Sequence, residues 1–383
     1  MAASTLFSPM MLRGVKLKNR IVISPMCQYS AIEGNVNDWH LVQYGRFAVG
    51  GAGLVFIEAT IVSRDGRATA GDLGIWDDEH VPGLRRITSF VKAQGAAVAL
   101  QLGHAGRKGA AQRPWHGMGP LGIEDAKNHE EFPWPLVGPT TEPVGEGWPV
   151  PSALTQEGIT ALREDYRAAA RRADEAGFDV IELHAAHGYL LHQFLSPLTN
   201  NRTDNYGGGA EERMRLPLEI AADLRACWPD DKPIFVRISA SDHAEGGFSA
   251  DDAIVLARRL RDVGVDVVDC SSGGISGSAT AGRLPRGFGF QVPYAEQVRK
   301  EADIATMAVG LITEPQHAAA IVVEGRADLI AIGRAALDDP NWPHHAAQVL
   351  AGKQTEDNFA AWPKQHGWWL ERRAQTLREI NER

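Results

Sequence analysis

Eight short apolar runs recur along this chain, each followed by polar residues and then, in most cases, by a stretch with helical spacing. Most of the runs are rich in Val, Ile or Leu and apolar almost throughout, which is typical of strands buried on both faces of a parallel sheet. Eight strand–helix units in 383 residues predict an α/β protein with a closed (β/α)8 (TIM) barrel. The predicted strands are Ile21–Ser24, Leu54–Glu58, Ala97–Leu102, Val180–His184, Ile234–Ile238, Val265–Cys270, Ala305–Val309 and Leu329–Ile332.

Two of the intervening stretches carry clear helix signals. Thr155 begins a run of apolar residues at helical spacing that stops at Gly177. Ser249 begins another, with Asp252 three residues on as in a capping box, and Gly264 ends it. An open doubly wound sheet is the alternative, but it would favour a GxGxxG turn after the first strand. The first strand runs into a proline instead, so the barrel is the favoured interpretation.

Three segments depart from a minimal barrel. Gln112–Ser152, after the third strand, holds eight prolines and three tryptophans, and we expect an ordered excursion over one barrel end because linkers seldom carry that much tryptophan. A glycine-rich loop, Gly273–Pro293, follows the sixth strand. We expect one barrel domain over residues 1–357 and a tail over 358–383. Pro217 falls inside an expected helix, which it should kink.

Composition narrows the function classes. The net charge is −9 with both signs interspersed, which argues against nucleic acid or anionic lipid as the main partner. Cys27, Cys227 and Cys270 show no CxxC spacing, so we expect no disulfide framework or structural zinc, and a cytoplasmic location. The N-terminus lacks a signal-peptide pattern, and no apolar run approaches the ~20 residues that cross a bilayer.

His184, His187 and Tyr189 form the sharpest polar cluster at a predicted strand end. Active sites of such barrels lie at the carboxyl ends of the strands, so both imidazoles can face one spot. Two N–H donors there could polarise a carbonyl or nitro oxygen while the tyrosine supplies a proton. The alternatives are a metal site and histidines satisfied by structural hydrogen bonds. No Glu follows as in HExxH and spacing reveals no third ligand, so we expect no metal, and two histidines with a tyrosine at one strand end favour function over a structural role.

Other strand ends suggest an anion site and a heterocycle site. Gly310 and Gly333-Arg334 follow the seventh and eighth strands, where barrels commonly bind phosphate through backbone N–H groups. Gln101 offers a donor and an acceptor to a pyrimidine-like edge, and Arg237 could tune a flavin there. Alternatively, Arg237 is a buried ion-pair partner of a neighbour such as Glu182 or Asp242. Cys27 could contact a cofactor ring or be a small buried hydrophobe.

These motifs resemble the old yellow enzyme family of FMN-dependent ene-reductases, especially its class III subgroup of bacterial NADPH dehydrogenases and xenobiotic reductases. The resemblance runs from Leu6 to about Arg372. It is carried by SPMCQY from Ser24, LGHAGRK from Leu102, HAAHGYLLHQFLSPLTNNRTDNYGG, RISASD and ADLIAIGRAAL. The Gln112–Ser152 excursion is closer to the xenobiotic reductase type than to the shortest members.

The resemblance implies a role for each motif residue. His184 and His187 would bind the activating group of the substrate, Tyr189 would donate the proton, and Tyr29 would line the substrate side. Trp369 and Arg372 would lie in a tail that crosses into a neighbouring subunit's active site. The residues implied to hold FMN are Ser24, Pro25, Met26, Cys27, Ala59, Gln101, Arg237, Gly310, Gly333 and Arg334.

The implied activity is reduction of activated C=C bonds, such as those of enones and nitroalkenes, by ping-pong chemistry. NADPH or NADH would reduce non-covalently bound FMN, flavin N5 would give hydride to the β-carbon, and Tyr189 would protonate the α-carbon. The implied assembly is a homodimer or homotetramer. A flavin-dependent dehydrogenase, demethylase or desaturase on the same scaffold is the alternative enzyme. A flavin-binding protein without turnover is the alternative from another class.

Overall fold

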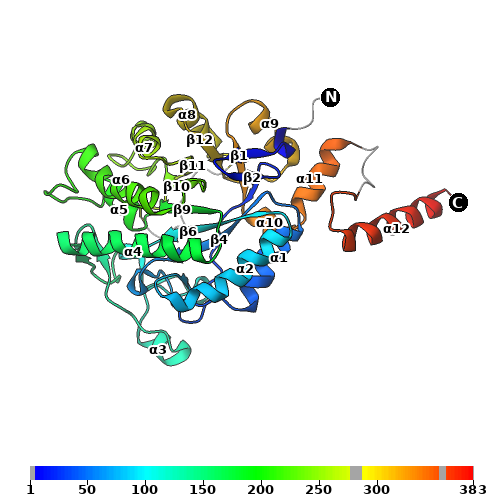
Figure 1. Cartoon of the computed structure of the whole chain (residues 1–383). Coiled ribbons are helices and arrows are strands. Elements are labelled where there is room, and N and C mark those ends of the chain that lie inside the picture. Colours follow the sequence, from blue (N-terminus) through cyan, green and yellow to red (C-terminus); the bar gives the residue numbers. More distant parts are fainter. Residues whose placement is uncertain (1–4, 277–286, 353–358, 383) are drawn as a thin grey trace.

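The computed structural model describes residues 5–276, 287–352 and 359–382, and shows a closed barrel of eight parallel strands (Figure 1). The sheet order is β3-β13-β12-β11-β10-β9-β6-β4, and β3 also pairs with β4, which closes the ring. All eight predicted strands are confirmed to within a few residues. The barrel strands are β3 (Ile21–Ile23), β4 (Leu54–Ile61), β6 (Ala97–Gly103), β9 (Val180–Ala185), β10 (Ile234–Ser239), β11 (Val267–Ser271), β12 (Ala305–Ala308) and β13 (Leu329–Ile332).

The lower half of the barrel interior is apolar. Side chains from all eight strands meet there in one buried cluster that includes Phe56, Phe235 and Met307. An antiparallel hairpin of β1 (Met10–Leu12) and β2 (Val15–Leu17) packs Leu12 and Leu17 against the same cluster. The amino-terminal end of the barrel is therefore plugged by the chain itself.

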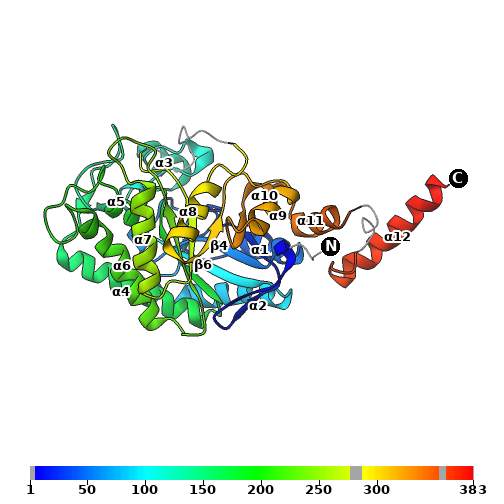
Figure 2. The ribbon, with the colours of Figure 1, turned by 90° about the horizontal axis from the view of Figure 1, so that it is seen from above.

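Helices surround the barrel, as parallel strands require of their crossovers (Figures 1 and 2). The capping signals are confirmed: Thr155 Oγ1 accepts from the N–H of Gly158 at 3.1 Å, and Ser249 forms the capping box with Asp252. The helices packed around the barrel are α1 (Asp38–Val49), α2 (Val81–Ala93), α4 (Gln156–Glu175), α5 (Leu190–Leu195), α6 (Ala210–Cys227), α7 (Ala250–Asp262), α8 (Val292–Ala302), α9 (Pro315–Val323), α10 (Arg334–Asp338) and α11 (Trp342–Ala351). Pro217 is buried inside α6, which continues through it as one helix.

The excursion after β6 is ordered, as predicted. It contains α3 (Ile123–His129) and the short parallel pair β7 (Val137–Gly138) and β8 (Ser152–Ala153). The Arg113 guanidinium at its start donates to the backbone carbonyl of Tyr29, which follows β3. The excursion therefore covers part of the carboxyl end of the barrel. The remaining short elements are β5 (Leu73–Gly74) and the 3-10 turns Thr5–Phe7, Arg64–Gly66, Asp78–His80, Gly106–Lys108 and Pro114–His116.

The tail forms α12 (Lys364–Asn381), which projects away from the barrel in both views (Figures 1 and 2). The predicted boundary between residues 357 and 358 lies outside the described residues, as does most of the glycine-rich loop after β11, residues 277–286. Within the described ranges, no helix is both long and apolar enough to cross a membrane.

Candidate active site

The predicted histidine–tyrosine cluster lies at the carboxyl end of β9 and in the turn that follows. The His184 ring is 5.2 Å from the His187 ring and 5.0 Å from the Tyr189 ring, measured between centroids, and is nearly perpendicular to both. Burial is the main cause that holds the pKa of each histidine well below its usual value, and the nearby Arg237 adds to it. Both imidazoles are therefore neutral at physiological pH, and each carries one N–H donor.

Hydrogen bonds fix the position of that proton. His184 Nδ1 accepts from the N–H of Ala186 at 3.2 Å, so the proton is on Nε2. His187 Nε2 lies 2.7 Å from Ser271 Oγ, and this hydroxyl donates to Gln291 Oε1 at 3.3 Å. With this hydroxyl donating to Gln291, Ser271 Oγ can accept from His187 Nε2, so that in this arrangement both histidines carry their proton on Nε2.

The turn that carries His187 is held by a buried lysine. His187 and Gly188 both have positive φ, 60° and 74°, and a Cβ on Gly188 would lie 2.1 Å from the carbonyl oxygen of Gly274. Lys108 Nζ donates to the carbonyl of His187 at 2.8 Å and to that of Gly274, and lies 5.9 Å from the centre of the Tyr189 ring. Burial lowers the pKa of Lys108 to about 7. This lysine thus ties together the loops after β9 and β11.

Below the histidines, the barrel interior carries polar side chains. Gln101 Nε2 donates to Glu182 Oε1 at 2.8 Å. Arg237 Nε pairs with Asp269 Oδ2 at 3.1 Å, and its Nη1 donates to Ser24 Oγ at 3.4 Å. The alternative interpretation of Arg237 as a member of a buried ion pair is therefore confirmed, but its partner is Asp269 and not one of the two suggested neighbours, Glu182 and Asp242. Neighbouring parallel strands place Asp269 directly beside Arg237, whereas Asp242 lies beyond the strand end.

Asp242 has other partners. Its carboxylate binds His192 Nε2 at 2.8 Å and accepts from Ser196 Oγ at 2.6 Å. These contacts fasten the loop after β10 to α5, so Asp242 is part of the scaffold of the site.

The segment after β3 begins beside the buried polar side chains of the barrel interior, where Ser24 accepts from Arg237. Ser24 is buried, and Pro25, Met26, Cys27 and Tyr29 are partly buried. Burial raises the pKa of the Cys27 thiol, and the charges of Glu58 and Asp72 raise it further, so Cys27 stays protonated. The prediction of a thiol beside a cofactor ring stays a prediction.

An irregularity in β4 shapes the same region. The register shifts between Ile57 and Ala59, so Ala59 pairs with Gln101 and Glu58 becomes the extra residue of a bulge. The buried Glu58 carboxylate accepts from the N–H of Gln28 at 2.6 Å and from the hydroxyl of Tyr44 on α1 at 2.8 Å. The bulge thus anchors the Cys27–Tyr29 segment from outside the barrel.

The predicted phosphate site lies after β12 and β13. Gly310 has φ of 123°, a conformation that disfavours any other residue. A Cβ on Gly333 would lie 3.6 Å from Met26 Sδ, so the two segments approach closely. Arg334 is exposed, and no hydrogen bond or ion pair links its guanidinium to the described residues. An unpaired cation beside two glycines suits a phosphate group.

The structure does not bring Trp369 and Arg372 to the chain's own histidines. Both lie on α12, where Trp369 is 68% exposed and the Arg372 guanidinium lies over the Trp368 ring at 5.2 Å. Trp362, by contrast, stacks on His344 of α11 at 4.6 Å and so packs on its own barrel.

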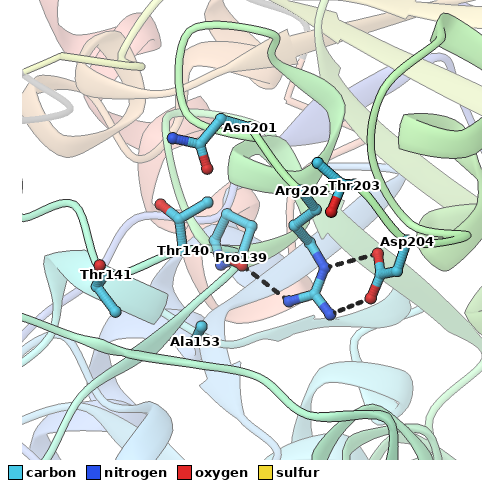
Figure 3. Close-up of a pocket in the computed structure, with 8 residues that line it drawn as sticks. All are labelled: Pro139, Thr140, Thr141, Ala153, Asn201, Arg202, Thr203 and Asp204. Carbon is cyan, nitrogen blue, oxygen red and sulfur yellow. Dashed lines mark hydrogen bonds and ion pairs between the residues drawn. The ribbon is translucent and has the colours of Figure 1, made fainter.

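A surface hollow of about 360 Å³ lies apart from these residues (Figure 3). Its charged groups satisfy each other: Arg202 binds both carboxylate oxygens of Asp204 and donates to the carbonyl of Pro139 at 2.8 Å. The contacts of Arg202 therefore fasten the excursion to the loop after α5. None of the residues that line the hollow is a candidate catalytic group. Among the described residues, no group of three or more His, Cys, Asp or Glu is placed to hold a metal ion.

The donor set fits a flavin mononucleotide. Gln101 is a buried amide facing the interior beside Ala59, and Arg237 is a buried cation. Arg334, after β13, has no charged or hydrogen-bonding partner among the described residues. Gln101 and Arg237 suit the pyrimidine edge of a flavin, and Arg334 suits its phosphate. Fold and site together fit one class of protein: a (β/α)8-barrel oxidoreductase that uses a flavin.

The chain belongs to the NADH:flavin oxidoreductase / NADH oxidase family, whose pattern matches residues 5–353. It is 44% identical to NADPH dehydrogenase of Geobacillus sp. (strain WCH70) over 347 residues, 90% of this chain and 94% of the relative. The resemblance to the old yellow enzyme family is confirmed, as are FMN as cofactor and a nicotinamide as reductant. The protein is an FMN-dependent oxidoreductase that takes its electrons from a nicotinamide.

Solved structures of other proteins share this barrel fold. Morphinone reductase matches with a TM-score of 0.74 and 27% identity over 91% of this chain and 90% of its own. A 2-naphthoyl-CoA reductase complex matches with a TM-score of 0.80 and 25% identity over 90% of this chain, which spans only 52% of that longer one. The (β/α)8 assignment is thereby confirmed.

Sequence reasoning missed three buried residues that organise the site: Lys108, Glu58 and Asp269. A signal existed for the last two, because each is a lone charge inside an otherwise apolar strand. Lys108 gave no such signal, since its partners are backbone carbonyls of distant loops.

Proposed function

We propose that this enzyme reduces the activated C=C bond of enones, nitroalkenes and similar acceptors. The observation that carries the proposal is the convergence of two neutral imidazoles and one protonated phenol at the end of β9. Bound FMN supplies the hydride that the acceptor takes up at its β-carbon. The residues of the chain bind the acceptor, polarise its activating group and protonate its α-carbon.

The histidines would hold the oxygen of the activating group. His184 Nε2–H has no acceptor among the described residues and would donate to the substrate oxygen, whereas His187 Nε2–H would exchange Ser271 Oγ for it. Neutral donors suit this role, because they stabilise negative charge developing on that oxygen without protonating it first. Tyr29, in the segment after β3 that the Glu58 bulge anchors, would line the same space.

Tyr189 would protonate the α-carbon. Burial raises the pKa of its phenol far above the usual value, so the proton is present at every physiological pH. The Lys108 ammonium over the ring would favour the phenolate that remains after transfer.

Half-reactions measured by stopped flow test this function. We expect NADPH to reduce the flavin of Tyr189→Phe at the normal rate, and cyclohexenone to reoxidise it about 10²-fold more slowly or worse. Tyr166→Phe is the matched control, because Tyr166 is buried on α4 outside the barrel. Unchanged reoxidation of Tyr189→Phe would remove the proposed role. Flavin reduction without turnover of any activated alkene would favour the dehydrogenase or binding-protein alternatives.

We further propose that the protein is a cytoplasmic homodimer or homotetramer in which α12 of one subunit reaches the substrate site of another, bringing Trp369 and Arg372. The support is the exposure of Trp368, Trp369 and Ile380 on a helix that its own barrel leaves largely uncovered. Three free cysteines agree with a reducing compartment.

Removing residues 364–383 tests the tail and leaves Trp362 on its own barrel. We expect weaker association in ultracentrifugation together with a changed KM for enones. Trp369→Ala in the full chain should change KM with a smaller effect on association. An unchanged oligomer with unchanged KM would show that α12 has no such role.

A further inference from the structure

Four inward-facing side chains form a buried layer in an otherwise apolar barrel interior. Gln101, Glu182, Arg237 and Asp269 come from four neighbouring strands, β6, β9, β10 and β11. Their exposed fractions are 2%, 0%, 7% and 0%. We call these four residues the inner polar layer. It follows the apolar lower cluster along the strands, and two of its members, Gln101 and Arg237, also belong to the proposed FMN site.

The layer holds two carboxylates and one guanidinium. Asp269 pairs with Arg237 at 3.1 Å, whereas Glu182 accepts one hydrogen bond from the neutral amide of Gln101. Glu182 Oε2 and both oxygens of Asp269 have no well-aligned hydrogen-bond partner among the described residues. Two buried carboxylates cannot both ionise at low cost beside a single cation. One of them must be a neutral acid.

The contacts decide which carboxylate keeps its charge. Burial and the charge of Asp269 raise the pKa of Glu182 well above its usual value. Burial also raises the pKa of Asp269, but Arg237 opposes this and leaves it at about 6. Asp269 is therefore the ionised member at neutral pH, and Glu182 is protonated.

We propose that Asp269, as the counter-ion of Arg237, lowers the reduction potential of the bound FMN, and that Glu182 is a neutral acid that orients Gln101. Both are positioning residues. The proposal rests on the FMN site proposed above, with Arg237 at the pyrimidine edge. A bare Arg237 would favour the negative charge that two electrons and one proton leave on the flavin, and Asp269 offsets that cation.

The sign of the effect separates this role from a merely structural one. Neutralising Asp269 leaves Arg237 uncompensated, so the reduced state gains and the potential rises. If Asp269 only held Arg237 in place, its loss would let the guanidinium move away and the potential would fall or stay constant. Glu182→Gln is an isosteric control at the same site, because a protonated Glu182 and the glutamine amide are both uncharged.

The experiment compares the FMN-loaded wild type with Asp269→Asn and Glu182→Gln by equilibration with a reference dye of known potential. We expect Asp269→Asn to shift the dye equilibrium roughly tenfold or more towards reduced flavin. Glu182→Gln should leave it unchanged and should remove a protonated-carboxyl band from the infrared spectrum. An unchanged or lowered potential in Asp269→Asn overturns the proposal, and so does a raised potential in Glu182→Gln.

The Glu182→Gln variant and the FMN binding of the wild type keep the test decisive. If Asp269→Asn does not fold, Glu182→Gln alone still decides which carboxylate is ionised, through its potential and its infrared band. A wild type that binds no FMN at all would instead contradict the proposed site. Failure of the inference and failure of the function are therefore distinguishable.

Discussion

The two ends of the barrel are made from the same eight strands but differ in almost every property. At the amino-terminal end, apolar side chains fill the interior and a short hairpin plugs it. At the carboxyl end, the interior carries Gln101, Arg237 and His184, and long loops cover it. The comparison teaches that one end adds to the free energy of folding by burying apolar side chains, while the other holds polar groups at a cost in that free energy.

Left-handed backbone conformations occur at both ends of the barrel but gather at the carboxyl end. Several non-glycine residues with positive φ follow strands at the carboxyl end, among them Tyr29, His187 and Leu311. Such conformations are costly and persist only where the surrounding structure holds them. Lys108 and the Glu58 bulge provide that support for the two turns nearest the proposed chemistry.

The largest expected effect comes from the apolar end. Phe235 is fully buried in the lower cluster, with its ring 6.0 Å from that of Phe56. Phe235→Ala should lower the free energy of unfolding by about 3–5 kcal/mol through lost burial and a cavity. Denaturant melts would measure it, with the exposed Phe132→Ala as the control that changes little. A loss below 1 kcal/mol for Phe235→Ala would mean that this end does not carry the stability.

Acidification should lower the stability of the fold through a buried histidine, His104, at the carboxyl end of the barrel. Burial lowers the pKa of His104 from 6.5 to about 4 in the folded protein. The unfolded chain therefore binds this proton first, so the contribution is fully present above pH 6.5 and is lost as the pH falls from 6.5 towards 4. We expect a loss of roughly 3 kcal/mol from His104.

His104→Asn isolates that contribution, because its side-chain oxygen can replace Nδ1 as acceptor for the N–H of Gly106. Unfolding free energies of both proteins between pH 7 and pH 4 give the difference. The variant should lose less stability than the wild type across this interval. Parallel pH profiles would show that His104 takes up its proton as readily when folded as when unfolded.

A smaller effect is expected at the edge of the polar end. Arg334→Ala should weaken FMN binding by roughly 1.5–3 kcal/mol, because one charge-assisted contact to the phosphate is lost. Fluorescence titration of the apoprotein with FMN measures the dissociation constant. Arg215→Ala on α6 is the matched control for the loss of an exposed arginine. Equal FMN affinity in both variants would place the phosphate elsewhere.

Much of the scaffold was predictable from the chain alone. The eight apolar runs, the capping residues Thr155 and Ser249, and the polar strand ends were all local signals, and the structure has each of them where it was expected. What could not be predicted was pairing between distant strands. The sequence suggested Glu182 or Asp242 as a partner of Arg237, and only the parallel register placed Asp269 at its side.

The sequence by itself determined the barrel and the end at which its polar residues gather, because burial on two faces and strand direction are properties of local pattern. The tertiary structure alone decided the protonation state of His184 and His187, the outward turn of Glu58 and the counter-ion of Arg237. Each of these depends on contacts between residues far apart in the chain. Such contacts arise from burial and register in the closed barrel, which no local pattern encodes.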